Sequence, residues 1–325
     1  MRHNFTVGFV VFLLCHFDAL GQSSGEACVP ARYKVTELPL HPAAVNSSLQ
    51  VAGTSMAHRA AIWKNDTGLT ELPLPEGYAY SEAVAINSGG DVVGNAHNRD
   101  FTKQLAFLYR RGVLTVLAGN QARAYGINDA DVVAGAALAA EGRTTVPVTW
   151  EKNVMRMPSQ CCGGSETGIN QLGHTIGDIY DDHGRFHAFL WSDARGPQQI
   201  GPTDRYSTAI AVNGNDHVVV QIFPVILLYS AGSLRRLNLH PHFPSKPLAI
   251  NNCDVIVGAF GPFSDADRAF VWEETLGFQD LNTKIPPGSG WKLESATGIS
   301  DNGVIVGRGD QKGRDDAGFM LMPER

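Results

Sequence analysis

Two stretches of sequence, "AINSGGDVVG" at residues 85–94 and "GINDADVVAG" at residues 126–135, decide the fold because they are variants of one ten-residue motif. Five more copies occur along the chain, at residues 44–53, 168–177, 211–220, 249–258 and 298–307. The third residue of the motif is Asn in six copies and Ser300 in the last. The copies are mostly 41 to 43 residues apart, with one interval of 38 and one of 49. A period of this size indicates a repeat protein, here with seven units.

Each repeat is predicted to form four short β-strands. The motif is typical of a hairpin, because Asn, Asp and Gly between its two apolar runs supply the positive-φ positions of a tight turn. A second apolar run follows, such as "HAFLW" at residues 187–191, and after another turn comes an outer run such as "LTELPL" at residues 69–74. Short runs rich in Val, Ile, Leu and aromatic residues indicate strands. We find no convincing amphipathic helix.

The arrangement of the repeats favours a closed propeller. The strands are apolar without strict alternation, which indicates burial on both faces, as in blades packed between neighbouring blades. The rival architecture is an open solenoid, which needs capping repeats. Residues 33–40, "YKVTELPL", resemble the outer run at residues 69–74, and the seventh repeat has no such run of its own. We therefore predict an all-β, seven-bladed β-propeller with four short strands per blade, forming one domain over residues 33–325, whose N-terminal strand closes the last blade.

The pattern "GIN…G…HAFLW" resembles the HAF-repeat family of predicted extracellular, mostly bacterial proteins. The resemblance covers essentially residues 33–325, although only the fourth repeat carries the literal triplet His187-Ala188-Phe189. Arg59 and Arg268 take the place of the histidine in two other copies. The resemblance implies secretion and a repetitive fold, and it implies no established catalytic residue for this chain.

The N-terminus predicts export. A weakly basic start is followed by an apolar stretch from Phe5 to Cys15, which is too short to span a bilayer. Small residues at Ala19 and Gly21 suit signal-peptidase cleavage, so residues 1–21 are predicted to be a signal peptide and residues 22–32 an N-terminal extension. The alternative is an uncleaved anchor. We expect a secreted protein, extracellular or periplasmic, with no transmembrane segment in the mature chain.

The amino-acid composition and charge limit the classes of molecule that the protein is expected to bind. With 43% hydrophobic residues, the 325-residue chain can bury a substantial core. The net charge is −6 and no basic block is present, so we expect no nucleic-acid partner. No metal-ligand spacing or cofactor motif stands out, and we expect no cofactor, no metal site and a monomer. Two N-glycosylation sequons begin at Asn46 and Asn65, and Asn46 is also the turn residue of the first repeat.

The mature chain keeps four cysteines, which an exported protein can oxidise. Cys28 precedes the closing strand, and Cys253 lies in the hairpin turn of the sixth motif. In a propeller these two positions share one face of neighbouring blades, so we hypothesise a Cys28–Cys253 disulfide that clamps the ring. Cys161 and Cys162 are then left as a vicinal pair. Two free thiols at 161 and 162, or an intermolecular bond, remain alternatives.

The loops between the second and third strands are predicted to carry function, because all of them emerge on one rim of a rigid scaffold. The candidate ligand-binding residues in these loops are His97, Arg99, Asp100, Asp181, Asp182, His183, Asp265 and Asp267. Such a ring of charges suits a glycan, a cation or a peptide, and the alternative is a set of ordinary solvated turns. The fifth repeat almost lacks this loop, which predicts a gap in the rim. We interpret His187 as a structural residue that bonds a neighbouring loop.

Two functions follow from this pattern. The first is a secreted binding or interaction module at or outside the cell envelope, with a glycan or a cell-surface component as partner. The second is a glycan-active hydrolase or lyase that uses rim-loop carboxylates. A glycosidase requires two carboxylates about 5–10 Å apart that face a central pocket, one of them with a raised pKa. No individual catalytic residue is predicted.

Overall fold

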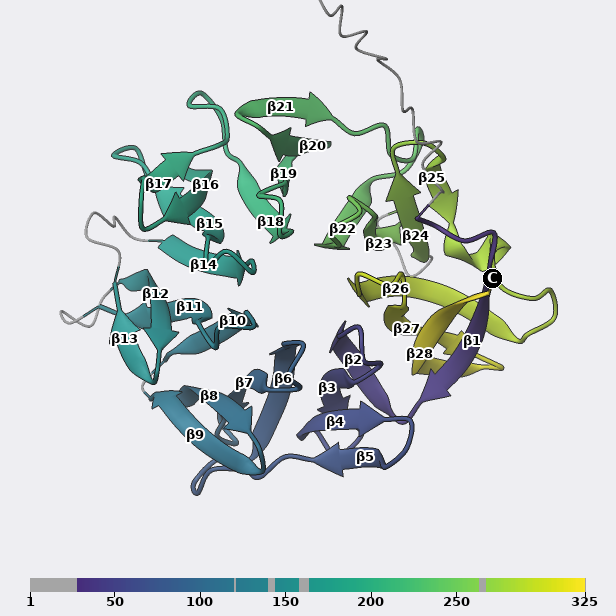
Figure 1. Cartoon of the computed structure of the whole chain (residues 1–325), viewed down its shortest axis with the longest axis horizontal. Helices are drawn as coiled ribbons and strands as arrows, with labels where there is room; N and C mark the ends of the chain where they lie inside the picture. The colour runs from purple at the N-terminus through teal and green to yellow at the C-terminus, as the bar shows by residue number, and fades with distance from the viewer. Residues whose placement is uncertain (1–27, 120, 140–143, 158–163, 263–266, 325) are drawn as a thin grey trace, which may run out of the picture.

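The computed structural model describes residues 28–119, 121–139, 144–157, 164–262 and 267–324. It contains seven four-stranded sheets arranged as blades around a central axis (Figure 1). The predicted all-β propeller with four short strands per blade is confirmed. Helical structure in the described ranges is limited to the short 3₁₀ segment η1 (Leu281–Thr283), and no helix there is long and apolar enough to cross a membrane. The predicted signal peptide lies outside the described residues.

Each blade starts with a strand beside the axis and runs outward. The innermost strands of blades one to seven are β2 (Leu40–Val45), β6 (Tyr80–Ile86), β10 (Arg123–Ile127), β14 (Gly164–Ile169), β18 (Thr208–Val212), β22 (Ser245–Ile250) and β26 (Trp291–Ile299). The second strands are β3 (Val51–Ser55), β7 (Val92–His97), β11 (Val133–Leu138), β15 (Thr175–Tyr180), β19 (Val218–Ile222), β23 (Ile256–Phe260) and β27 (Ile305–Gln311).

The outer half of each blade follows in chain order. The third strands are β4 (Ala60–Lys64), β8 (Gln104–Arg110), β12 (Thr145–Glu151), β16 (Phe186–Ser192), β20 (Val225–Ser230), β24 (Arg268–Glu273) and β28 (Arg314–Glu324). The outermost strands are β5 (Gly68–Glu71), β9 (Val113–Ala118), β13 (Val154–Arg156), β17 (Gly196–Gln199), β21 (Ser233–Arg236), β25 (Gly277–Asp280) and, in blade seven, β1 (Arg32–Leu38).

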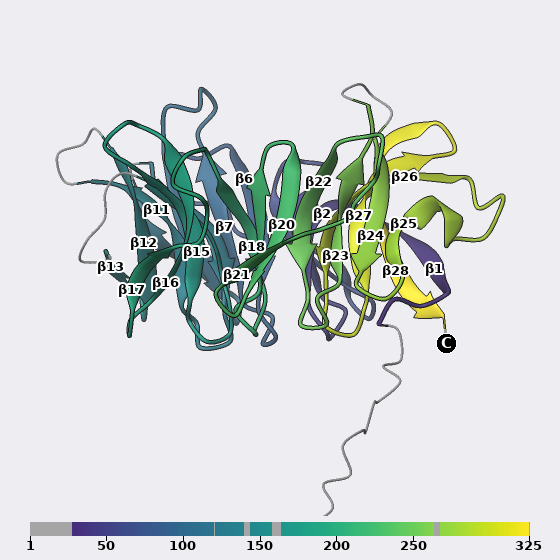
Figure 2. The same ribbon diagram turned by 90° about the horizontal axis from the view of Figure 1, so that it is seen from above.

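The N-terminal strand completes the last blade, as predicted. β1 pairs antiparallel with β28 through seven consecutive residue pairs, from Arg32 opposite Glu324 to Leu38 opposite Gly318. The strands run between two faces of the ring (Figure 2). We call the face with the motif hairpins the turn face. The opposite face, with the loops between second and third strands and the crossovers between blades, is the loop face.

The Gly that ends most motif copies has a packing reason. In blade two, Gly94 lies directly opposite Phe107 of the third strand. A Cβ added at Gly94 would stand 2.1 Å from the Glu82 carbonyl oxygen and 2.5 Å from the Phe107 ring. In blade five both the glycine and the aromatic residue opposite it are replaced, because Val220 lies opposite Leu227. The absence of a side chain at Gly94 therefore leaves the space that the Phe107 ring of the third strand occupies.

The motif asparagines form a second, unexpected feature, which we call the asparagine belt: Asn46, Asn87, Asn128, Asn170, Asn213 and Asn251. Each is at most 6% exposed. Each Oδ1 accepts a hydrogen bond from one or two backbone N–H groups of its own turn. Each Nδ2 donates to the carbonyl oxygen of the equivalent residue in the next blade, at 3.0–3.3 Å.

The belt closes by a different route at the seventh blade. The Ser300 hydroxyl accepts from the Val304 N–H at 3.1 Å, so it serves its own turn as the asparagines do. The bond to the first blade comes instead from Asn302, whose Nδ2 donates to the Ser47 carbonyl oxygen at 3.0 Å. Seven side-chain bonds therefore link the turn face into a circuit around the ring.

Candidate functional site

Two adjoining hollows open on the loop side of the central channel. One has a volume of about 430 Å³ and is lined by the inner strands of blades one, two, six and seven and by the second strands of blades one and seven. The other, of about 370 Å³, lies between blades one and two, and both hollows are lined by Thr54 and Glu82. We call the pair the channel groove. Its lining residues are His41, Pro42, Ala43, Thr54, His58, Tyr80, Ser81, Glu82, Ala83, Val84, His97, Phe101, Leu248, Thr297 and Arg308.

The outer end of the channel groove is aromatic. The rings of Tyr80 and Phe101 are nearly parallel, with centroids 5.8 Å apart and an interplanar angle of 15°. The His58 ring stands edge-on to Tyr80 at 6.0 Å, and the His97 ring lies 5.6 Å from Phe101. Phe101 is 68% exposed. A large exposed aromatic beside a hollow is a feature of binding surfaces rather than of a packed core.

The loop that carries Phe101 is held by its own polar side chains. Asn98 accepts from the Lys103 N–H at 2.8 Å and donates to the Thr102 hydroxyl at 3.0 Å. The Asp100 carboxylate accepts from the same hydroxyl at 2.9 Å. These short Asx-type bonds fix the loop while Phe101 takes a left-handed backbone angle, φ 57°. The exposed ring is therefore presented by an ordered loop.

Polar groups accompany the aromatic rings. The His97 Nε2 lies 4.0 Å from the Glu82 carboxylate. Burial lowers the pKa of His97 and the nearby Arg123 charge lowers it further, against the opposing effect of Glu82. At neutral pH His97 is thus a neutral imidazole, with one donor and one acceptor nitrogen. At the channel end, Arg308 pairs with Asp316 at 3.1 Å.

Those of the predicted rim-loop residues that the structure describes lie in several different loops and do not converge on one site. Of the eight, His97 lines the channel groove, whereas Asp100 caps its own turn, and the hydrogen bond from Thr102 lowers its pKa. Arg99 is exposed. Asp267 accepts from the Lys246 ammonium at 3.1 Å, and Asp265 lies outside the described residues.

The blade-four loop is folded around Asp181. Its carboxylate accepts from the N–H groups of His183 and Arg185 at 2.8 and 2.9 Å and from the Arg185 guanidinium at 2.8 Å. The His187 Nε2 lies 3.1 Å from the same carboxylate. Although burial alone raises the pKa of Asp181, these hydrogen bonds hold it well below its usual range. Asp182 and His183 are exposed on the same loop.

His187 is a structural residue in this arrangement. It is only 3% exposed, and its Nδ1 lies 3.0 Å from the Pro202 carbonyl oxygen in the crossover to blade five. Its neighbours Ala188 and Leu190 pack against Ala209 and other residues of blade five. The histidine thus ties the third strand to two loops, as the sequence interpretation expects.

Asp178 has the same place in blade four as Asn95 in blade two. The Asn95 amide bonds both backbone groups of Ala124 in the next blade, accepting at 2.8 Å and donating at 3.1 Å. The Asp178 carboxyl accepts from the Ala209 N–H at 3.1 Å. Burial raises the pKa of Asp178 to about 6, against that hydrogen bond. This carboxyl joins two blades and does not line the channel groove.

The sequence-based interpretation does not identify Tyr80 and Glu82, because it treats the inner strands as scaffold. It does not identify Phe101, because it takes only ionisable residues of the rim loops as candidates. One available signal was the residue five positions before the motif Asn or Ser. Charged or ionisable side chains occupy it in four blades, as His41, Glu82, Arg123 and Lys246. Another was the single large apolar residue in the polar loop "HNRDFTK" at residues 97–103.

Two further hollows lie outside the channel groove. The larger, about 840 Å³, lies on the turn face between blades three and four, and its wall at Met157 adjoins residues 158–163, which are outside the described residues. The other, about 410 Å³, lies beside Pro224 and His240 where the loop of blade five is short. This hollow lies at the blade whose short loop predicts a gap in the rim.

Comparisons with known proteins support the fold. No protein-family model matches the chain, and no curated protein matches it in sequence. Among solved structures, the propeller domain of the Trilobed protease from Pyrococcus furiosus, described as having an open velcro topology, is similar: the TM-score is 0.59 and the identity 8%, over 90% of this chain and 96% of that chain.

Two other structures are similar to a comparable degree. A chain of the Mitotic Checkpoint Complex matches with a TM-score of 0.56 and 13% identity, over 94% of this chain and 98% of that chain. YCF48 bound to D1 peptide matches with a TM-score of 0.52 and 10% identity, over 90% and 96%. At these identities the likeness shows the propeller fold alone.

Proposed function

We propose that the protein is a secreted binding module that holds a carbohydrate in the channel groove. The observation that carries the proposal is the stacked pair of the exposed Phe101 and the half-buried Tyr80, beside Glu82 and the neutral His97. The predicted signal peptide and the resemblance to HAF-repeat proteins support a place outside the cytoplasm.

A carbohydrate fits the chemistry of these four side chains. The flat apolar face of a pyranose ring stacks on an aromatic ring, as Phe101 offers at the mouth of the groove. Its hydroxyl groups need acceptors and donors at the ring edge, which the Glu82 carboxylate and the His97 imidazole supply. A pocket with aromatic walls and a few placed polar groups is the usual form of a small-ligand site.

Binding is favoured over hydrolysis by the carboxylate count. Glycoside hydrolysis uses two carboxyl groups that flank the scissile bond. Among the described residues that line the channel groove, Glu82 is the only carboxylate. The carboxyl of Asp178, whose pKa is raised to about 6, lies between blades four and five.

A glycan array, followed by calorimetry on the glycans that bind, tests the proposal on the mature chain. Losing an aromatic side chain that stacks on a nucleic-acid base costs about 1–3 kcal/mol, and by analogy Phe101→Ala should weaken binding by about 5- to 150-fold. Tyr206→Ala is the matched control, because Tyr206 is a 53% exposed aromatic outside the groove. Equal binding by wild type and Phe101→Ala, or no binding to any glycan, would overturn the proposal. Release of shorter sugars from a bound polysaccharide would favour the enzyme instead.

A further inference from the structure

Two thiols from distant parts of the chain meet where the ring is closed. Cys28 immediately precedes Val29 and the closing strand β1, and Cys253 lies in the hairpin turn of blade six. Both are exposed free cysteines in the structure. Their position is independent of the channel groove, and nothing in the proposed function uses them.

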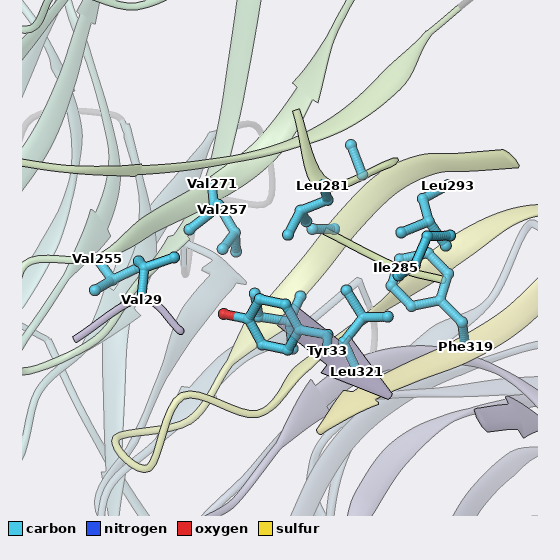
Figure 3. Close-up of a cluster of buried hydrophobic side chains, with 13 residues drawn as sticks. Val29, Tyr33, Val255, Val257, Val271, Leu281, Ile285, Leu293, Phe319 and Leu321 are labelled. Atoms are coloured by element: carbon cyan, nitrogen blue, oxygen red, sulfur yellow. The ribbon is translucent and has the colours of Figure 1, made fainter. Parts of the chain in front are cut away.

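The residues beside the two cysteines are fixed against each other. Val29 and Val255 are 3% and 1% exposed and belong to one apolar cluster between blades six and seven, where Figure 3 shows them side by side. The Val29 N–H also donates to the Glu273 carboxylate of blade six at 3.2 Å. The Cys253 N–H donates to Asn251 of the asparagine belt at 3.0 Å, which holds the turn. Both backbones are therefore anchored within one or two residues of the thiols.

The thiols themselves are in contact. The side chains of Cys28 and Cys253 form a hydrogen bond, and together with burial it raises the pKa of Cys28 to about 11. A disulfide requires the two cysteines to adjoin each other, and the hydrogen-bonded thiols of Cys28 and Cys253 adjoin each other on anchored backbones.

We propose that Cys28 and Cys253 are oxidised to a disulfide that locks the closing strand onto blade six. The oxidant is a disulfide of the secretory compartment, either a thiol oxidoreductase or oxidised glutathione. One cysteine thiolate attacks the oxidant and forms a mixed disulfide; the second thiolate then displaces the oxidant as its reduced thiols. Two protons leave the cysteines and two electrons pass to the oxidant.

The bond would act on the strand that closes the ring. β1 is held by its pairing with β28, and its start is also held by two contacts to Lys284, the residue that follows η1. Tyr33 donates its N–H to the Lys284 carbonyl oxygen at 2.9 Å, and the Lys284 ammonium donates to the carbonyl oxygen of Pro30, just before β1, at 2.8 Å. A disulfide at Cys28 adds a covalent link to blade six at the start of this segment. Blade seven then cannot lose β1 completely while the bond is intact.

Peptide mapping tests the bond directly. The mature chain, exported to an oxidising compartment, is alkylated, digested with trypsin without reduction and analysed by mass spectrometry. We expect a cross-linked pair of peptides containing Cys28 and Cys253 that separates on reduction. Complete alkylation of both thiols, or a link from Cys28 to Cys161 or Cys162, would overturn the proposal.

A second measurement tests whether the disulfide stabilises the folded protein. The melting temperature of the oxidised protein should fall on addition of dithiothreitol. In the Cys28→Ser/Cys253→Ser variant the reductant should have no effect, whereas in Cys161→Ser/Cys162→Ser the full effect should remain. A wild-type melting temperature that is unchanged by reduction, or a fall that persists in the Cys28→Ser/Cys253→Ser variant, would contradict the clamp.

Discussion

Removing one asparagine of the belt should destabilise the whole ring, and Asn128 is the clearest case because it is only 1% exposed. Its Oδ1 accepts from the N–H groups of Ala130 and Val132 at 3.1 and 3.0 Å, and its Nδ2 donates to the Asn170 carbonyl oxygen at 3.2 Å. Each such bond contributes about 1 kcal/mol net. Asn128→Ala should therefore lower the free energy of unfolding by about 3 kcal/mol.

Two conservative variants separate the contribution of the hydrogen bonds within the turn from that of the hydrogen bond to the next blade. Asn128→Asp keeps both acceptor bonds but turns a carboxylate oxygen towards the Asn170 carbonyl, so it should cost about 2 kcal/mol. Asn128→Ser imitates Ser300, whose hydroxyl serves its own turn, and should cost about 1–2 kcal/mol. Asn65→Ala, in an exposed turn, is the control and should change stability by less than about 0.5 kcal/mol.

Urea unfolding followed by tryptophan fluorescence measures these differences, since the chain has five tryptophans. With a slope near 3 kcal/mol/M, a loss of about 3 kcal/mol lowers the midpoint by about 1 M. A midpoint for Asn128→Asp equal to that of the wild type, beside a large loss for Asn128→Ala, would refute the inter-blade role. The asparagine would then act on its own turn alone.

Two further predictions follow from burial. In a host that glycosylates, Asn65 should carry glycan and Asn46 should not, because Asn65 is exposed whereas the Asn46 amide is buried and donates to Gln50 and to the next blade; glycopeptide mass spectrometry reads the occupancy. Asp178→Asn should stabilise the protein by about 1–3 kcal/mol at pH 7.5, because burial raises the pKa of Asp178 in the folded state to about 6 and ionisation there costs folding energy. The cost is absent below the unfolded pKa near 4 and fully present above about pH 6, so the gain should shrink between pH 6 and pH 4 in urea titrations.

Either prediction has a clear contrary result. Glycan on Asn46 of the folded protein would contradict the burial of that amide. An Asp178→Asn variant that is less stable than the wild type at pH 7.5 would show that the carboxylate is needed in its charged form, and a gain that is independent of pH would show that burial of the charge is not its cause.

The blade count and the closing strand could be predicted because each repeat carries its own local signals. Gly94 and its counterparts mark the second strand, the Asn turns mark the hairpins, and the leftover strand at residues 33–40 matches the run missing from blade seven. These signals act within one blade or between directly paired strands. Because of the repetition, the Asn and Gly signals each recur in six of the seven copies.

The channel groove could not be predicted in the same way. His41 and Leu248 line the same hollow although 207 positions separate them, so their meeting depends on closure of the ring. The exposure of Phe101 depends on a loop conformation set by Asn98 and Asp100, which the sequence shows only as polar residues. The belt bonds between blades were hidden for a similar reason, because turn chemistry alone accounts for Asn at those positions.

The pairing of β1 with β28 also sets an order of events during biosynthesis. Arg32 lies opposite Glu324, so β1, which is synthesised before the other blade strands, can pair only after β28 has been synthesised. A contact between residues so far apart in the sequence forms slowly, because the chain loses the conformational entropy of loop closure before the strand pairing can stabilise the structure. We expect the six blades with locally paired strands to form first and ring closure to be the final step. Premature release of the chain would then yield six packed blades with one open edge, a species prone to self-association.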